Sequence, residues 1–149
     1  MDPLGPDELA LWHAWKRAVE RVRTRVAADI TAETGLSDPD FTVLTRVAED
    51  DGRIRQNQLA DWMGYHRSRL SHHLSRMEER GLVTRQQASV GVDVLITDAG
   101  LAAVTQARPV HAAAVRRHLL DPLSGIDREA LRTSLELLVP QPSAGPERE

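Results

Sequence analysis

The sequence predicts a mainly α-helical protein with one small β-hairpin, and three observations support this fold class. Apolar residues recur at spacings of three and four along most of the 149 residues, which is the period of one face of a helix. Strand-like sequence is confined to residues 82–85 and 92–96, and Gly91 between them can adopt the positive φ that a hairpin turn needs. Hydrophobic residues make up 41% and charged residues 28%, as in a globular protein with one core.

The first predicted helix spans residues 7–33. Pro6 and Asp7 supply its start, and Gly35, which tolerates a left-handed conformation, ends it. One side of this helix is lined by six apolar residues: Trp12, Trp15, Val19, Val22, Val26 and Ile30.

A second helix is expected to begin at Ser37, whose hydroxyl can cap free backbone N–H groups. It ends before the turn signal at Gly52 and carries three residues inward: Phe41, Leu44 and Val47. A short segment around Ile54 leads to the next helix.

Two helices separated by a glycine turn are predicted next. The first covers residues 56–63 and ends at Gly64. The second is longer, from His66 to Arg80, with Gly81 as its C-cap. The hairpin follows directly.

The C-terminal third is predicted to be helical again. A helix starts at Thr97 and runs to Leu120, and Pro109 inside it should bend the helix or divide it in two. Asp127 caps a last helix, and residues 140–149 are expected to form a frayed tail. Three residues share one side of the last helix: Leu131, Leu135 and Leu138.

The helix of residues 66–80 has two different faces. At 100° per residue, Leu70, Leu74 and Met77 fall within about 60° of one another. The other side carries hydroxyl, imidazole and guanidinium groups, namely Ser68, Ser71, His72, Ser75 and Arg76, which suit contacts with phosphates and base edges. The predicted order of elements is that of a winged helix-turn-helix: a short helix, a glycine turn, a longer helix and a hairpin. In that fold the second helix enters the DNA major groove.

The charge distribution agrees with this interpretation. The net charge is −3, but residues 52–87 carry seven arginines against three acids, hence +4, which leaves −7 for the rest of the chain. Positive charge gathered in one part of an acidic protein indicates an anion-binding face.

Four blocks of sequence, in order and at matching spacing, resemble the MarR family of bacterial transcription regulators. They read LADWMG (59–64), HRSRLS (66–71), RMEERGLV (76–83) and LITDAG (95–100). The detailed resemblance covers residues 41–100, and the flanking helices match in position only. It implies a homodimer with a helical dimerisation region, residues 1–36 and 98–149, and a winged helix-turn-helix, residues 37–97.

The resemblance also implies which residues contact DNA. The longer helix would supply His66, Arg67, Ser68, Arg69, Ser71 and His72 for bases or phosphates, with Arg76 on the backbone. At the start of the preceding helix, Gln56, Asn57 and Gln58 would hold a phosphate. Arg85, at the base of the wing, is a further candidate for a phosphate contact.

Two features depart from the family pattern. The family's wing usually carries an arginine that reaches the minor groove, but residues 86–93 contain none, and the wing looks shorter. Losing that contact should lower affinity and relax the preference for flanking A·T sequence. Trp62 stands where the family usually has a polar or charged residue. An exposed tryptophan there could pack on the wing or on a neighbouring helix, but we expect a partly buried core aromatic.

The partners expected are palindromic double-stranded DNA and a second copy of the chain. Two recognition helices reading half-sites about 10 base pairs apart require a dimer. The terminal helices carry more apolar residues than one small winged domain needs: Trp12, Trp15, Val19, Val22, Leu119, Leu120, Leu131, Leu135 and Leu138.

Many members of the family respond to small aromatic acids held between the dimer helices and the winged domain. A ring stacked on tryptophan and a carboxylate held by Arg17 or a histidine would provide such a site. The candidates are Trp12, His13, Trp15, Arg17, Phe41 and Trp62. The alternative is that these tryptophans form only the interface core.

Other classes of function are disfavoured. The chain has no cysteine, phosphate-binding glycine loop or nucleophile elbow, so we expect neither an enzyme nor a cofactor. The six histidines show no converging metal-ligand spacing. No apolar run approaches the roughly 18 residues of a membrane span, and a cytoplasmic protein is expected. The remaining rival is a winged-helix module for protein or ligand binding with weakened DNA binding, motivated by the short wing.

Overall fold

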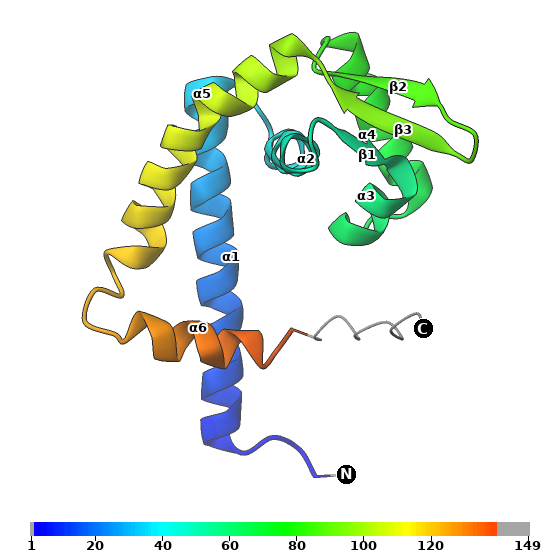
Figure 1. The fold of residues 1–149 in the computed structure, drawn as a ribbon. Helices are drawn as coiled ribbons and strands as arrows, with labels where there is room; N and C mark the ends of the chain where they lie inside the picture. Colours follow the sequence, from blue (N-terminus) through cyan, green and yellow to red (C-terminus); the bar gives the residue numbers. More distant parts are fainter. Residues whose placement is uncertain (1, 140–149) are drawn as a thin grey trace, which may run out of the picture.

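A computed structural model describes residues 2–139, and its architecture is the predicted one, mostly helical with a small sheet. The elements are α1 (Pro6–Thr34), α2 (Asp38–Glu49), β1 (Arg53–Arg55), α3 (Gln56–Met63), α4 (Arg67–Glu79), β2 (Val83–Gln87), β3 (Val92–Ile96), α5 (Asp98–Val115), the π-helical turn η1 (Arg116–Leu120) and α6 (Arg128–Glu136). Figure 1 shows α2 to α4 and the sheet as one compact region, from which α1 extends well away. The tail expected at 140–149 lies outside the described residues.

The sheet has three antiparallel strands, whereas the sequence predicted two. Its order is β1-β3-β2, and Arg55 of β1 pairs with Asp93 of β3 in the register. Three residues are too few to show the alternation that identifies a strand from sequence. The hairpin itself is confirmed, and its turn closes through Gly91 at φ +76°.

The helix boundaries follow the predicted caps. Gly35 ends α1 in the left-handed conformation, and the hydroxyl of Ser37 accepts a hydrogen bond from the backbone N–H of Asp40 at the start of α2. Thr97 and Asp127 accept equivalent hydrogen bonds at the starts of α5 and α6. Short polar side chains at these positions satisfy N–H groups that a helix leaves unpaired.

The core is formed by α2, α3, α4 and the sheet, and it continues into Ile30 of α1 and Val104 and Ala107 of α5. Leu70, Leu74 and Met77, predicted to form the apolar back of the longer helix, are fully buried. They pack with residues of the other winged-region elements, including Val43, Leu44, Leu59 and Val94. One face of α4 is therefore fixed by the core and the other is left for solvent or a partner.

The start of α5 rests directly on the connection between α4 and β2. The hydroxyl of Thr97 donates to the carbonyl oxygen of Gly81 at 2.6 Å, and the N–H of Thr97 donates to the carbonyl oxygen of Leu82. A Cβ at Gly100 would overlap the same Leu82 carbonyl. Only glycine allows this close approach between the winged region and α5.

The long helices α1 and α5 pack side by side (Figure 1). Pro109 lies inside α5 without dividing it, and the irregular backbone comes later, at η1. There Nε2 of His118 lies 2.9 Å from Oδ2 of Asp29, and Arg117 donates to the same oxygen at 3.0 Å. This cluster ties the far end of the α5 segment to α1.

The terminal parts of the described chain expose apolar surface. No residue of α6 is buried, although Leu131 and Leu135 share one side of it. Trp12 and Trp15 of α1 are 49% and 40% exposed. Among the helices described, none is long and apolar enough to span a bilayer.

Candidate nucleic-acid interface

The outward face of α4 gathers most of the predicted DNA-binding residues. His66 is the N-cap of the helix, and no acidic residue occupies its first turn. Exposed side chains on this face are His66, Arg67, Ser68, Arg69, His72 and Arg76. Because the opposite face is buried, this set of cations and hydroxyls is presented on a fixed support.

The three arginines of this face have different surroundings. The guanidinium carbon of Arg69 lies 3.9 Å from the centroid of the Tyr65 ring. A terminal nitrogen of Arg76 lies 3.2 Å from Nδ1 of His73. The side chain of Arg67 makes no hydrogen bond or ion pair with any other residue in the described part of the chain.

A buried carboxylate anchors the C-terminal half of α4. Oδ1 of Asp40, in α2, lies 3.3 Å from Nε2 of His73, and Oδ2 accepts a hydrogen bond from Arg80 at 2.7 Å. Burial raises the pKa of Asp40, but the contacts with His73, Arg80 and Ser37 outweigh it and hold the pKa well below its ordinary value. The carboxylate is therefore ionised and joins α4 to α2.

Arg85 joins the wing to α4. Its Nε donates to Glu78 at 2.8 Å, and its two terminal nitrogens donate to the hydroxyls of Ser71 and Ser75 at 3.2 and 2.9 Å. The sequence predicted a phosphate contact for Arg85. In the structure its guanidinium contacts α4, and its side chain is 24% exposed.

Beyond Arg85 the wing has no arginine, since residues 86–93 contain none, but β1 places two beside it. Arg53 and Arg55 donate to the two carboxylate oxygens of Asp93, from Nε at 2.8 and 2.7 Å. The hydrogen bond from Arg53, helped by the charges of both arginines, holds the pKa of Asp93 below its ordinary value. Sequence reasoning missed this cluster because nearly 40 residues separate its members and nothing local signals the pairing.

The start of α3 lies close to the wing and to α4. Gln56 lines a cleft of about 270 Å³ together with Ser71, Arg85, Gln86, Gln87 and Val92. Asn57 and Gln58 are exposed in the same first turn. The structure thus brings the predicted scaffold, recognition and wing residues to one side of the winged region.

The predicted effector residues do not meet in one cavity of the single chain. Trp12, His13, Trp15 and Arg17 are exposed on the first half of α1, whereas Phe41 is buried with its ring centroid 5.0 Å from that of His111. Trp15 and Arg17 line a groove of about 870 Å³ along α1.

The expectation that Trp62 is a partly buried core residue is wrong. The side of α3 that faces the core is filled by Leu59 and Ala60, so Trp62 points outward and is 52% exposed. The guanidinium of Arg46 lies over its ring, 5.4 Å from the centroid. Within residues 2–139, no group of three or more histidine or acidic side chains is placed to hold a metal ion.

Comparison with known proteins agrees with this geometry. Residues 34–91 match the sequence model of the MarR family. The winged-helix region of this chain is therefore similar to the domain that defines the MarR family. The matched residues run from the end of α1 to the wing turn and include every predicted DNA-binding residue.

Solved MarR structures extend the similarity to nearly the whole chain. AbsC from Streptomyces coelicolor, a MarR family transcriptional regulator, is 28% identical, with a TM-score of 0.84 over 93% of each chain. Sco3205 from the same organism, solved in complex with DNA, is 25% identical, with a TM-score of 0.87 over 99% of this chain and 97% of its own. CouR from Rhodococcus jostii RHA1, bound to p-coumaroyl-CoA, shares the fold at 23% identity, with a TM-score of 0.72 over 86% and 88%. No curated protein matches the sequence. AbsC and Sco3205 are both MarR family transcriptional regulators.

Proposed function

We propose that this chain is a homodimeric, sequence-specific DNA-binding transcription regulator that inserts α4 into the major groove. The outward face of α4 carries the proposal, because cations and hydroxyls are exposed over a fully buried apolar back. Arginine pairs with guanine edges, and serine and histidine serve bases or phosphates. The DNA-bound state of the similar Sco3205 supports the same use of the fold.

The proposed division of labour follows the fold. Residues 37–97 would form the DNA-binding unit, with Gln56, Asn57 and Gln58 meeting a phosphate at the start of α3. Residues 1–36 and 98–149 would form the dimerisation region. The Arg85 network would hold the wing beside α4.

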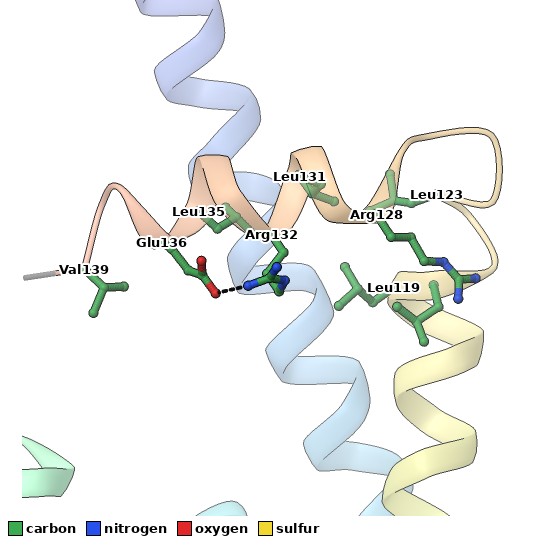
Figure 2. Close-up of a pocket in the computed structure, with 9 residues that line it drawn as sticks. Leu119, Leu123, Arg128, Leu131, Arg132, Leu135, Glu136 and Val139 are labelled. Atoms are coloured by element: carbon green, nitrogen blue, oxygen red, sulfur yellow. Dashed lines mark hydrogen bonds and ion pairs between the residues drawn. The ribbon is translucent and has the colours of Figure 1, made fainter. Parts of the chain in front are cut away.

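The dimer is supported by apolar surface that the single chain leaves uncovered. A cavity of about 320 Å³ separates η1 and the following loop from α6, and its walls are mainly leucine (Figure 2). Leu119, Leu123, Leu131, Leu135 and Val139 line it, with Arg132 paired to Glu136 at the rim. Contiguous apolar surface of this kind marks an interface. A second copy covering α6 and the first half of α1 would bury it.

Selection of bound sequences from a random DNA pool at near-physiological salt tests the function. A palindrome with half-sites about 10 base pairs apart is expected. Arg67→Ala should weaken binding and reduce the salt dependence by about one released ion. Arg108→Ala, an exposed arginine of α5, is the matched control and should leave binding unchanged. Failure to enrich any sequence would overturn the proposal.

The rival is a winged-helix module that no longer reads DNA. The observation that favours this rival is the wing, where the two β1 arginines are paired with Asp93 and the turn between the strands has no cationic residue. The same selection separates the two functions, because the rival predicts no enriched palindrome.

An aromatic-acid effector is a further part of the proposal. Its support is the α1 groove lined by Trp15 and Arg17 and the p-coumaroyl-CoA bound to CouR, which shares the fold. Isothermal titration of the dimer with salicylate-like acids tests it. Binding that Arg17→Ala abolishes is expected, and no heat across a panel of such acids would contradict it.

A further inference from the structure

Tyr65 holds one arginine of α4 in place. This tyrosine follows Gly64, which ends α3 in the left-handed conformation, and the N–H of Tyr65 donates to the carbonyl oxygen of Ala60 at 2.9 Å. Its ring packs partly against the hydrophobic core. Backbone and ring are therefore both fixed at the turn between α3 and α4.

Arg69 lies in the first turn of α4 and stacks on this ring. The distance of 3.9 Å from its guanidinium carbon to the ring centroid is well inside the range of a cation–π contact. Such a contact restricts an arginine that is otherwise free to sample many rotamers.

The stack leaves the hydrogen-bonding capacity of Arg69 intact. Its donors lie in the guanidinium plane, whereas stacking uses only a face of that plane. Arg69 is exposed and, within residues 2–139, its side chain makes no hydrogen bond or ion pair with another residue. A restrained group with its donors free suits the two acceptors, O6 and N7, that guanine presents in the major groove.

Arg67 provides the internal comparison. It is exposed in the same turn of α4, carries the same charge and has no aromatic ring among the cation–π contacts of the described chain. A mobile arginine neutralises phosphate charge well but discriminates bases poorly, because ordering it on binding costs conformational entropy.

We propose that Tyr65 is a specificity-determining positioning residue, which fixes the guanidinium of Arg69 so that it reads a guanine in each half-site. This inference rests on the proposed DNA-binding function and adds to it the base and the residue that sets its recognition. Tyr65 itself need not touch DNA.

The test measures discrimination as well as affinity. After the operator is selected with the wild-type protein, dissociation constants are measured by fluorescence anisotropy for that duplex and for duplexes with each guanine replaced. The proteins compared are the wild type, Tyr65→Phe, Tyr65→Leu, Arg69→Lys, Arg69→Ala, Arg67→Ala and the double variant Tyr65→Leu/Arg69→Ala. Circular dichroism and melting temperature check that each variant folds.

One guanine should be preferred by the wild type about 5- to 150-fold, the range of a bidentate base contact. Tyr65→Phe keeps the ring face and should retain that preference, whereas Tyr65→Leu should reduce it about 2- to 5-fold at that guanine alone. Arg69→Ala should abolish most of it, and Arg69→Lys should reduce it, since an ammonium group lacks the planar fork of the guanidinium and does not stack on the ring in the same way. Arg67→Ala should weaken binding to all duplexes alike.

The double variant separates positioning from a structural role. If Tyr65 acts through Arg69, replacing it in the Arg69→Ala background should not change discrimination further. Two results would overturn this inference but leave the proposed function standing. In the first, Tyr65→Leu discriminates between the duplexes as well as the wild type does. In the second, Tyr65→Leu has the same effect on discrimination in the Arg69→Ala background as it has alone. Should Tyr65→Leu fail to fold, Arg69→Ala decides, and a guanine preference unaffected by it would overturn the assignment. A wild-type protein that selects no sequence would overturn the proposed function as well.

Discussion

Oδ2 of Asp40, in the first turn of α2, accepts a hydrogen bond of 2.7 Å from Arg80, the residue that caps the end of α4. The same carboxylate contacts His73 and is only 2% exposed. The orientation of the proposed recognition helix thus depends on one buried negative charge outside that helix.

Asp40→Ala should lower the free energy of unfolding by about 3 kcal/mol, because it leaves Arg80 and His73 without their buried partner. Urea denaturation measures this change. Asp38→Ala is the control, since Asp38 lies in the same turn but its side chain is 48% exposed. That change should cost less than about 1 kcal/mol. Equal losses in the two variants would contradict the assigned role of Asp40.

Stability should fall in acid partly through Asp40. Its pKa is lower in the folded than in the unfolded chain, so its contribution is complete above the ordinary value of 3.8 and is lost as the pH falls below it. Asp93, whose pKa is also lowered, acts in the same direction. Urea midpoints between pH 7 and pH 3 should decline more steeply for the wild type than for Asp40→Asn. Parallel declines would show that Asp40 is not responsible.

Gly100→Ala should destabilise the protein by about 3 kcal/mol or more, since the added methyl group meets the Leu82 carbonyl and neither backbone can yield cheaply. Gly125→Ala is the matched control, because a Cβ there meets nothing within 4 Å. It should change stability by less than about 0.5 kcal/mol. Melting temperatures of both variants test this prediction. A Gly100→Ala protein that is as stable as the wild type would contradict it.

Arg85→Ala should loosen the wing from α4 and cost about 1.5–3 kcal/mol, as for hydrogen bonds to a charged group. Hydrogen exchange of the β2 amides, followed by mass spectrometry, should become faster while that of α2 stays unchanged. Gln86→Ala removes the exposed neighbour and serves as the control. Unaltered exchange in β2 would mean that Arg85 does not hold the wing.

Leu135→Glu should disrupt the proposed dimer without unfolding the chain, because α6 contains no buried residue. Light scattering at micromolar concentration should give half the wild-type mass, together with weaker binding to a palindromic duplex. Thr133→Glu adds the same charge to an exposed position on the other side of α6 and should remain dimeric. A monomeric wild type would refute the dimer directly.

Local signals in the sequence predicted most of the fold. Ser37, Gly35 and Thr97 identify helix ends because capping depends on residues within one turn. The buried back of α4 was likewise predictable from its period. By contrast, β1 is too short to show a pattern, and Trp62 is apolar although it faces outward. Composition alone does not distinguish these cases from core residues.

The site was predicted in part. The arginines of α4 were evident from charge and period, but the groups that hold them were not. Asp40 lies 40 residues from Arg80 in sequence, and Arg53 lies equally far from Asp93. Pairings at such separations are set by tertiary packing and leave no local trace. The stack of Arg69 on Tyr65 is closer in sequence, but it depends on the direction of the chain after Gly64.

The network of Arg85 has a mechanical consequence. Because hydrogen bonds join the hairpin to α4, neither element can move alone when the width of a DNA groove varies. The winged region of each subunit would therefore have to rotate as one rigid body. In the proposed dimer, adjustment to operators of unequal length would then fall to α1 and α5, which are joined where Arg117 and His118, at the end of the α5 segment, contact Asp29. The range of half-site spacings that such a dimer tolerates would then depend on the stiffness of the packed α1 and α5 helices, which themselves contact no base.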